Sequence, residues 1–433
     1  MRTHRLVLFQ RLALVTILGL HLTFLLMRDG QLQVLAVDPL NIGNPPGAYE
    51  TNDDQTIVRD FHMHRAYIER IWKRVTDRPY TLTGQEKIFR DWAPRLPVGM
   101  PHAYSPTAAI IGWPFVFLLR DVQTSFFVFA GINLLGILLL YQFYLFPRID
   151  NYYALAGVVI AGISTCVIGT VIVGQTSVLT TCALALTWHL LYDVKRQKLR
   201  KLTLSTELLL GLILYFSTAK PPMAIVFGAI LLGARAWRAA ALGVVLFAAT
   251  ALGMAKYYGG SLWVSDYIYF LSHYYKAGMT PFFQNCFIYQ IGSNPTDFLA
   301  LTMGVPDADS AAVFQPLCLT VSIFVILFAW RGMIRPATTF QLQILNLLLL
   351  APYLRVSEDF LIVLLIAEGI VLGTQAKLVE WLKLFLLLCI WNSRECGLEQ
   401  ILHCNPAYPC KVALTLIIVV SMARARGKIA ARS

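Results

Sequence analysis

The chain of 433 residues contains little charge, because Asp, Glu, Lys and Arg together make up only 14% of it. Soluble domains carry about 25% of these residues, so the shortage excludes an ordinary soluble protein. Hydrophobic residues reach 57%, and the mean hydropathy is +0.61. Such a chain must bury its apolar surface against lipid and neighbouring helices, and we expect an integral membrane protein.

A nucleic-acid-binding module is also missing, although the formal net charge of +12 would suit one. Most Lys and Arg residues lie in short connections between apolar runs. This placement is typical of the cytoplasmic loops of membrane proteins and explains the positive charge without nucleic acid.

Several signals of processing and metal binding are absent. The first apolar run, Leu6 to Met27, has no small-residue cleavage site and is too long for a signal-peptide core, so we expect an uncleaved anchor. No internal repeat stands out, and the paired CxxC spacing of metal sites is missing. No Asn-x-Ser/Thr acceptor has an allowed middle residue, since proline follows Asn294. This last absence favours a bacterial inner membrane over an endoplasmic reticulum.

Cysteine usage leaves the redox state open. The chain has eight cysteines. Cys396, Cys404 and Cys410 are close enough in sequence to form a disulfide in an oxidising compartment, and they could equally be free thiols.

Apolar runs dominate the rest of the chain, and each is long enough for a helix. They cover residues 6–27, 123–146, 152–173, 176–192, 204–219, 221–234, 237–255, 316–330, 339–353, 357–373, 378–391 and 411–422. A shorter run, 107–119, contains Trp113-Pro114. If this run does not cross the membrane, the basic cluster 195–201 lies inside the cell, as the positive-inside rule requires. We therefore predict twelve spans with both ends cytoplasmic.

The predicted fold class is all-α and polytopic, with residues 1–433 forming one membrane domain. Under this topology the larger extracytoplasmic segments are 28–122, 256–315 and 392–410. The first of these contains a stretch, 60–75, with apolar residues at helical spacing and the charge pairs Arg65–Glu69 and Glu69–Lys73 four residues apart. We expect 60–75 and 107–119 to be interfacial helices.

Polar clusters fall on one face of the membrane under this topology. They are Asp53 to Arg65, Tyr104-Ser105-Pro106, Gly174-Gln175-Thr176, Lys220-Pro221-Pro222, and Arg355 with Glu358 and Asp359. Their convergence on the extracytoplasmic face predicts a site there.

Asp60 is the candidate with the clearest chemical role. A carboxylate near the bilayer surface can accept a proton from a hydroxyl nucleophile. At the start of a helix, Asp60 can instead cap free backbone N–H groups, and His64 would share its face. The local spacing by itself favours the cap, whereas the common face with Lys220 and Gln175 favours the base.

Lys220 is the candidate for binding an anion. Pro221 turns the chain, and the flanking runs are short, so the turn is expected to lie below the lipid surface and line a cavity. A cation beside a helix N-terminus there would receive a phosphate, and the alternative is a lysine that snorkels to the interface. Arg355 could likewise bind an anion or snorkel to the interface, and its neighbours Glu358 and Asp359 could neutralise its charge. Gln175 could bind a sugar hydroxyl or satisfy the turn.

The order of these motifs resembles one enzyme family, the polyprenol-phosphate-mannose-dependent mannosyltransferases of the GT-C superfamily. The matching elements are Asp60-Phe61, Tyr104-Ser105-Pro106, Gly174-Gln175, Lys220-Pro221 and Pro352-Tyr353 followed by Asp359-Phe360. Members often carry a histidine near the late proline motif, where this chain has Asp359.

The resemblance implies a GT-C-like fold and inverting transfer of a hexose, mannose in the family, from a polyprenyl-phosphate-sugar donor to a lipid or glycan acceptor. It implies no cofactor, no metal and no nucleotide sugar. Asp60 would be the general base, and Lys220 and Arg355 would bind the donor phosphate. The further candidate contacts to donor or acceptor are His64, Tyr104, Gln175 and Asp359.

Two other classes of function fit the same composition. A transporter or flippase of lipid-linked sugars would also have many helices and broken pairs, but it predicts internal repeats and charges near the midplane. A polysaccharide polymerase or ligase would share the lipid-phosphate site. The enzyme reading places the active site on the periplasmic or exterior side of a multi-pass membrane protein.

Overall fold

The structure is a computed structural model of the chain. It describes residues 2–36, 48–50, 56–58, 60–92, 104–272, 294–304, 307–352, 356–372, 377–392 and 406–430.

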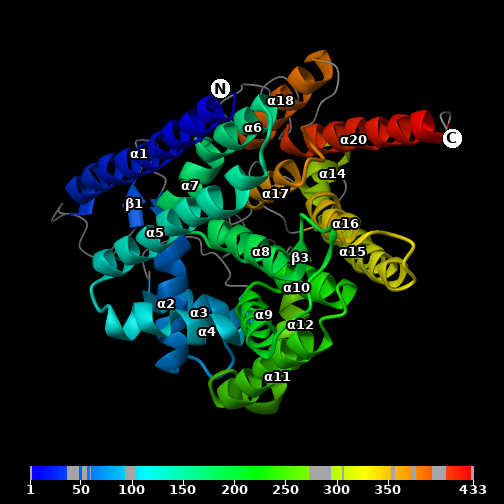
Figure 1. The fold of residues 1–433 in the computed structure, drawn as a ribbon. Helices are drawn as coiled ribbons and strands as arrows, with labels where there is room; N and C mark the ends of the chain where they lie inside the picture. Colours follow the sequence, from blue (N-terminus) through cyan, green and yellow to red (C-terminus); the bar gives the residue numbers. More distant parts are fainter. Residues whose placement is uncertain are drawn as a thin grey trace.

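Helices build the described part of the chain (Figure 1). The longest α-helices are α1 (Arg2–Ala36), α5 (Val122–Leu139), α11 (Trp237–Met254), α15 (Asp307–Trp330) and α20 (Ala407–Ala430). The shorter ones are α2 (Asp60–Trp72), α3 (Leu82–Trp92), α4 (Pro106–Trp113), α6 (Tyr152–Gly162), α7 (Thr165–Val173), α8 (Ser177–Leu191), α9 (Leu204–Ser217), α10 (Pro221–Gly233), α12 (Trp263–Ser272), α14 (Pro295–Met303), α16 (Pro336–Leu350), α17 (Ile362–Ala367) and α18 (Lys377–Trp391).

Tighter or wider helical turns continue several of these helices. The π-helical segments are η2 (Pro114–Leu118) and η3 (Leu140–Leu145), and the 3₁₀ segments are η4 (Phe146–Arg148), η5 (Ala255–Tyr257), η6 (Gly260–Leu262) and η8 (Val356–Leu361). Strands are confined, within the described ranges, to two antiparallel ribbons: β1 (Ala48–Glu50) with β2 (Thr56–Val58), and β3 (Tyr192–Asp193) with β4 (Lys198–Leu199). The all-α prediction is confirmed for these residues.

Five helical stretches of the described chain are long and apolar enough to cross a membrane: Leu6–Met27, Val122–Arg148, Tyr152–Ile172, Trp237–Tyr257 and Asp309–Trp330. The other predicted runs form shorter apolar helices, and the topology of twelve spans stays a prediction. Two of the runs are not continuous helices. The run 152–173 breaks at Ile163, where Ser164 caps the start of α7. The run 357–373 divides into η8 and α17, which ends at Ala367.

The apolar core forms two clusters of different character. The larger one runs through the bundle and includes Phe126, Trp188 and Trp391. The smaller one is rich in aromatic rings and joins α2 and α3 to the end of α11 and to α12 through residues such as Tyr80 and Tyr258, whose rings stack. In Figure 1, α2, α3 and α4 lie together below α5, and α4 packs against α9 and α11. The helices of the segment that was predicted to be an extracytoplasmic loop are thus packed into the fold.

α2 shows how sequence periodicity becomes packing. Its apolar residues Phe61, Ile68 and Ile71 are buried, as the spacing predicts. Both predicted charge pairs form, with Arg65 Nη1 at 4.0 Å and Lys73 Nζ at 2.6 Å from Glu69. The helix ends earlier than the expected 60–75, because Arg74 takes a left-handed φ of 53°.

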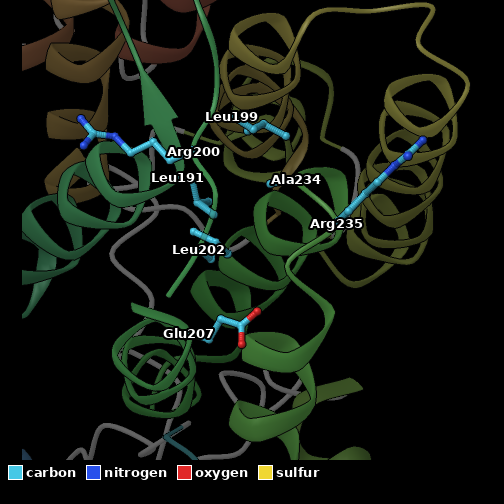
Figure 2. A pocket seen from close by; sticks show the side chains of 7 residues that line it. All are labelled: Leu191, Leu199, Arg200, Leu202, Glu207, Ala234 and Arg235. Carbon is cyan, nitrogen blue, oxygen red and sulfur yellow. The ribbon is translucent and has the colours of Figure 1, made fainter. Parts of the chain in front are cut away.

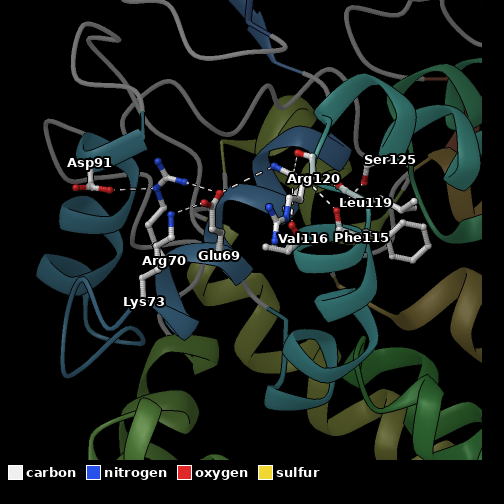
Figure 3. Close-up of polar contacts among 10 residues, drawn as sticks. Glu69, Arg70, Lys73, Asp91, Phe115, Val116, Leu119, Arg120 and Ser125 are labelled. Carbon is white, nitrogen blue, oxygen red and sulfur yellow. Dashed lines mark hydrogen bonds and ion pairs between the residues drawn. The ribbon is translucent and has the colours of Figure 1, made fainter.

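A charged network fastens α2 to its neighbours (Figure 3). Arg70 bonds both Glu69 and Asp91 of α3. Arg65 donates to the carbonyls of Phe115 and Arg120, at 3.0 and 2.9 Å, and so satisfies the end of η2. Burial raises the pKa of Glu69, but Lys73 and the two arginines outweigh it, so the pKa lies below its usual value. The segment 106–118 is helical as predicted, whereas α3 was not expected from the sequence.

Candidate functional site

The described site residues that the sequence predicts come from α2, from the segments just before α4, α8 and α10, and from η8. Asp60 is the first residue of α2, and its side chain lies outside the described part of the structure. His64 lies four residues further along α2. Tyr104 precedes α4, Gln175 lies between α7 and α8, and Lys220 is the N-cap of α10.

Of the two candidates late in the chain, the structure describes Asp359 and does not describe Arg355. Asp359 belongs to η8. Arg355 lies outside the described residues, and so do Asp53, Asp54, Cys396 and Cys404. The expectation that Arg355 binds a second anion therefore stays a prediction.

The start of α2 packs against the turn between α7 and α8. Phe61 lies among Phe115, Phe126 and Phe129, with ring centroids 5.1–6.0 Å apart. Gly174 ends α7 with φ of +76°, and a Cβ there would overlap the Cβ of Phe61. A glycine is required for both reasons: the left-handed backbone and the close approach of α2. The chain therefore brings the residue after Asp60 against the residue before Gln175.

The Tyr104-Ser105 segment is hydrogen-bonded to the turn before Lys220. Ser105 N donates to Ala219 O at 3.1 Å, and Ser105 Oγ donates to Thr218 O at 2.6 Å. Thr107 and Thr218 share a hydroxyl contact of 2.7 Å. These bonds join two polar clusters that are more than 100 residues apart in the chain.

Tyr104 links this segment back to α2. Its ring lies edge-on to the ring of His64, with centroids 4.3 Å apart. Its backbone carbonyl accepts from Tyr80 Oη at 2.8 Å. Burial raises the pKa of Tyr80 well above its usual value, so the hydroxyl stays protonated and available as a donor.

Lys220 forms an ion pair with Glu358 of η8. The same carboxylate oxygen, Oε1, accepts from Ser177 Oγ at 2.9 Å. The Glu358 side chain is 2% exposed and that of Lys220 is 24% exposed. The carboxylate is thus buried, whereas the lysine side chain is partly exposed. Sequence proximity assigned Glu358 to Arg355, whereas its described partners come from 138 and 181 residues away.

Asp359, the next residue of η8, is bound by a lysine that sequence reasoning did not single out. Lys411 of α20 donates to Asp359 Oδ1 at 2.9 Å, and both side chains are almost fully buried. Trp391 Nε1 donates to the backbone carbonyl of Asp359 at 3.0 Å. The available signal was a lysine at the start of the last apolar run, on the face where the other clusters were predicted.

The described contacts close into a ring, which we call the contact ring. It passes from Phe61 to Gly174, through Ser177 to Glu358 and Lys220, and back through Ser105, Tyr104 and His64 to α2. Each of the five predicted clusters therefore contributes described residues to the contact ring, and the roles given to them stay predictions. The ring contains a partly exposed cation, Lys220, and lies beside the neutral amide residue Gln175 and the start of α2.

The N-terminus of α10 differs from the anion receptor that the sequence analysis expected. Its first two residues, Pro221 and Pro222, have no backbone N–H. The backbone N–H of Met223, the third residue of α10, donates to Lys220 O at 2.9 Å. The peptide dipoles still favour an anion, but hydrogen bonds to an anion here must come from the Lys220 side chain. Both prolines were visible in the sequence.

No group of three or more His, Cys, Asp or Glu side chains that could hold a metal ion occurs among the described residues.

A cavity of about 240 Å³ lies at the opposite ends of α9 and α10 from Lys220. It is lined by Leu191, Leu199, Arg200, Leu202, Glu207, Ala234 and Arg235. Figure 2 shows that Arg200 and Arg235 point away from each other, and each donates to a backbone carbonyl. A helix of 14 residues separates the cavity from the contact ring, which amounts to about 21 Å. The cavity contains none of the predicted site residues, and we assign it no part in the site.

The chain matches the model of a known protein family. The model of a family described as Glycosyltransferase family 87 matches residues 102–353, which is more than half of the chain. The matched region includes Tyr104, Gln175 and Lys220 and ends just before η8. No curated protein and no solved structure matches the chain.

Proposed function

The chain belongs to glycosyltransferase family 87 and is a membrane glycosyltransferase, and from this premise we propose that its donor is a polyprenyl-phosphate sugar. The transferred sugar is a hexose, mannose by the sequence resemblance, and the acceptor is a lipid or glycan at the extracytoplasmic face. The observation that carries this proposal is the contact ring with its partly exposed Lys220. A lipid-borne donor presents its sugar phosphate at headgroup depth, where a single accessible ammonium group can bind it.

The proposed reaction is an inverting displacement. Asp60 takes the proton from an acceptor hydroxyl, whose oxygen attacks the anomeric carbon of the donor. The bond between that carbon and the phosphate oxygen breaks, and the phosphate leaves with the electron pair. Lys220 stabilises the charge that develops on the leaving oxygen. One carboxylate suffices, because transfer with inversion needs no second carboxylate acting as nucleophile.

The contact ring supports these roles by proximity. Phe61 packs against Gly174, so the start of α2 lies at the turn that carries Gln175. Lys220 is tied to the same turn through Glu358 and Ser177. The base and the phosphate-binding residue would thereby lie on different elements around one acceptor site. His64 of α2 and Tyr104, in the segment before α4, would line that site. Asp359 is bound to Lys411, and we no longer place it among the groups that contact substrate.

The test is a transfer assay with purified protein in proteoliposomes. Wild type is supplied with polyprenyl-phosphate mannose, polyprenyl-phosphate glucose or the matching nucleotide sugars, and glycolipid products are identified by mass spectrometry. We expect transfer from a polyprenyl-phosphate sugar alone, and loss of about 1,000-fold or more of kcat in Asp60→Asn, because the general base contributes most of the activation of the hydroxyl.

Two results would contradict the proposal. One is transfer from the nucleotide sugars in the absence of a lipid donor. The other is movement of the lipid-linked sugar across the bilayer without any new glycosidic bond, which would indicate a transporter.

A further inference from the structure

Lys220 is bound by Glu358, which is bound in turn by Ser177, and the proposed mechanism uses neither of these two residues. Glu358 Oε1 bonds both Lys220 Nζ and Ser177 Oγ. The carboxylate is 2% exposed, whereas the lysine is 24% exposed. The two groups are therefore not a solvated surface pair: one member lies inside the protein, and the other lies between it and the surface.

A carboxylate in such a place is costly. Removing an ionised carboxylate from water costs several kcal/mol, and an ion pair with one buried member often gives no net stability over apolar residues. Stability therefore does not account for Glu358. A lysine that only snorkels to the membrane surface needs no buried partner, because its ammonium group reaches water on its own. The pairing has a clear consequence for geometry, which is to hold Nζ in one place.

The prolines of α10 make this geometry matter. Pro221 and Pro222 remove the N–H groups that a helix N-terminus would offer to an anion. Among the described residues, Glu358 is the acceptor of Lys220 Nζ, which leaves two of its three N–H bonds for a ligand. The bond to the buried Glu358 carboxylate anchors the ammonium group at one of its N–H groups. A flexible lysine without this anchor would lose rotamer freedom each time it bound a phosphate.

The next residue of η8 fixes the anchor itself. Asp359 is bound by Lys411 through its side chain and by Trp391 through its carbonyl, and Phe360 beside it is 1% exposed. Three helices, α8, α18 and α20, thus hold the short η8 segment from which Glu358 reaches Lys220. The carboxylate that binds the ammonium group is thus itself held by buried contacts.

From this arrangement we propose that Glu358, supported by Ser177, is a positioning residue that holds the Lys220 ammonium group for the phosphate of the donor. This inference rests on the proposed function, since it concerns the same phosphate. It assigns Glu358 no contact with substrate: Glu358 acts through Lys220, and its effect is expected in donor binding and not in recognition of the acceptor.

The experiment measures steady-state transfer in proteoliposomes for wild type, Lys220→Ala, Glu358→Gln and Ser177→Ala. Glu358→Gln keeps the shape of the side chain and removes its charge. We expect a donor KM raised about 10-fold or more in Glu358→Gln, about 3-fold in Ser177→Ala, and an acceptor KM within about 2-fold of wild type in both. Equilibrium binding of unsugared polyprenyl phosphate should weaken in the same order.

A matched control is available at another buried carboxylate. Glu368 is 6% exposed, pairs with Arg148 at 3.4 Å and accepts from Tyr144 Oη at 2.9 Å, at the other end of α17 from η8. Glu368→Gln should lower thermal stability and leave the donor KM as in wild type. Ser177→Ala keeps both charges, so it reports on positioning even if Glu358→Gln does not fold.

The outcomes separate this inference from the proposed function. A donor KM unchanged in both Glu358→Gln and Ser177→Ala, with Lys220→Ala impaired, would overturn the inference and leave the function intact. Equal increases of donor KM in Glu358→Gln and Glu368→Gln would also overturn it, because the effect would then be structural. Failure of wild type to use any polyprenyl-phosphate sugar would overturn the proposed function, and the inference with it.

Discussion

Two lysine–carboxylate pairs meet at neighbouring residues of η8, and they differ in their access to the surface. Lys220 pairs with Glu358 and is 24% exposed, whereas Lys411 pairs with Asp359 and is 2% exposed. Both lysines come from helices distant in sequence, and both carboxylates are buried. We call Lys411–Asp359 the closed pair and Lys220–Glu358 the open pair. The closed pair fixes a helix against the bundle, and the open pair presents a cation. Exposure, and not residue type, distinguishes them.

The largest expected effect concerns the closed pair. Lys411→Ala leaves the Asp359 carboxylate buried without its cation, which should lower the free energy of unfolding by about 3–5 kcal/mol. Thermal unfolding in detergent measures this loss. The double variant Asp359→Leu with Lys411→Met replaces the pair by apolar groups of similar size and should recover most of the stability. If Lys411→Ala were as stable as wild type, the closed pair would not fix α20 against the bundle.

The open pair should differ in its effect on activity. Lys220→Ala removes the cation at the leaving phosphate and should lower kcat/KM for sugar transfer by about 100- to 1,000-fold per folded molecule. Because it also leaves the Glu358 carboxylate buried without its cation, a loss of stability is expected as well. Transfer kinetics and thermal unfolding are measured on the same preparation. Large instability with ordinary activity per folded molecule would make Lys220 the structural residue and erase the distinction between the pairs.

Sequence reasoning singled out one member of each pair, Lys220 and Asp359, and missed the partner of each for a physical reason. Pro221 marks the turn at Lys220, and a turn between short apolar runs can be read from one segment of chain. Lys411 has no local mark, because its importance comes from Asp359, 52 residues earlier. Glu358 was paired with Arg355 by closeness in sequence, but folding gives it Lys220 and Ser177. Long-range pairing of charges has no signature in a single sequence.

The helices were more accessible to prediction than their partners. Apolar runs and the spacing of Arg65, Glu69 and Lys73 predict α2 and its ion pairs, because a helix sets those contacts within one or two turns. α3 is short and polar and was not predicted. The meeting of Phe61 with Gly174 depends on the fold of the whole chain, although the glycine itself could be read from the sequence.

A smaller effect tests whether α2 must stand beside the open pair. Gly174→Ala places a side chain at φ of +76° and against Phe61, which should cost about 1–3 kcal/mol of stability. Because the overlap displaces the start of α2, we expect the transfer activity per folded molecule to fall in addition to the loss of stability. The control is Gly228→Ala, where a Cβ would have open space. Equal activity of the two variants per folded molecule would contradict the role given to this contact.

The smallest effect concerns charges that belong to neither pair. Lys73 and Arg70 keep the pKa of Glu69 below its usual value, so the stability that Glu69 contributes is present at neutral pH and is lost as the pH falls through that lowered pKa. Glu69→Gln should therefore lower the melting temperature slightly at pH 7 and leave it nearly as in wild type in strong acid. Thermal unfolding from pH 7 to pH 3 measures this. A difference that grows in acid would contradict the assignment.

The central claim is that, of the two pairs, the open one binds the phosphate of the lipid donor. The most direct measurement is equilibrium binding of polyprenyl phosphate to Lys220→Met and to the Asp359→Leu, Lys411→Met double variant, each in its folded form. We predict that Lys220→Met weakens binding by about 10-fold or more, which is about 1.4 kcal/mol, and that the double variant binds as wild type does. Wild-type affinity in Lys220→Met, or an equal loss in the double variant, would contradict the claim.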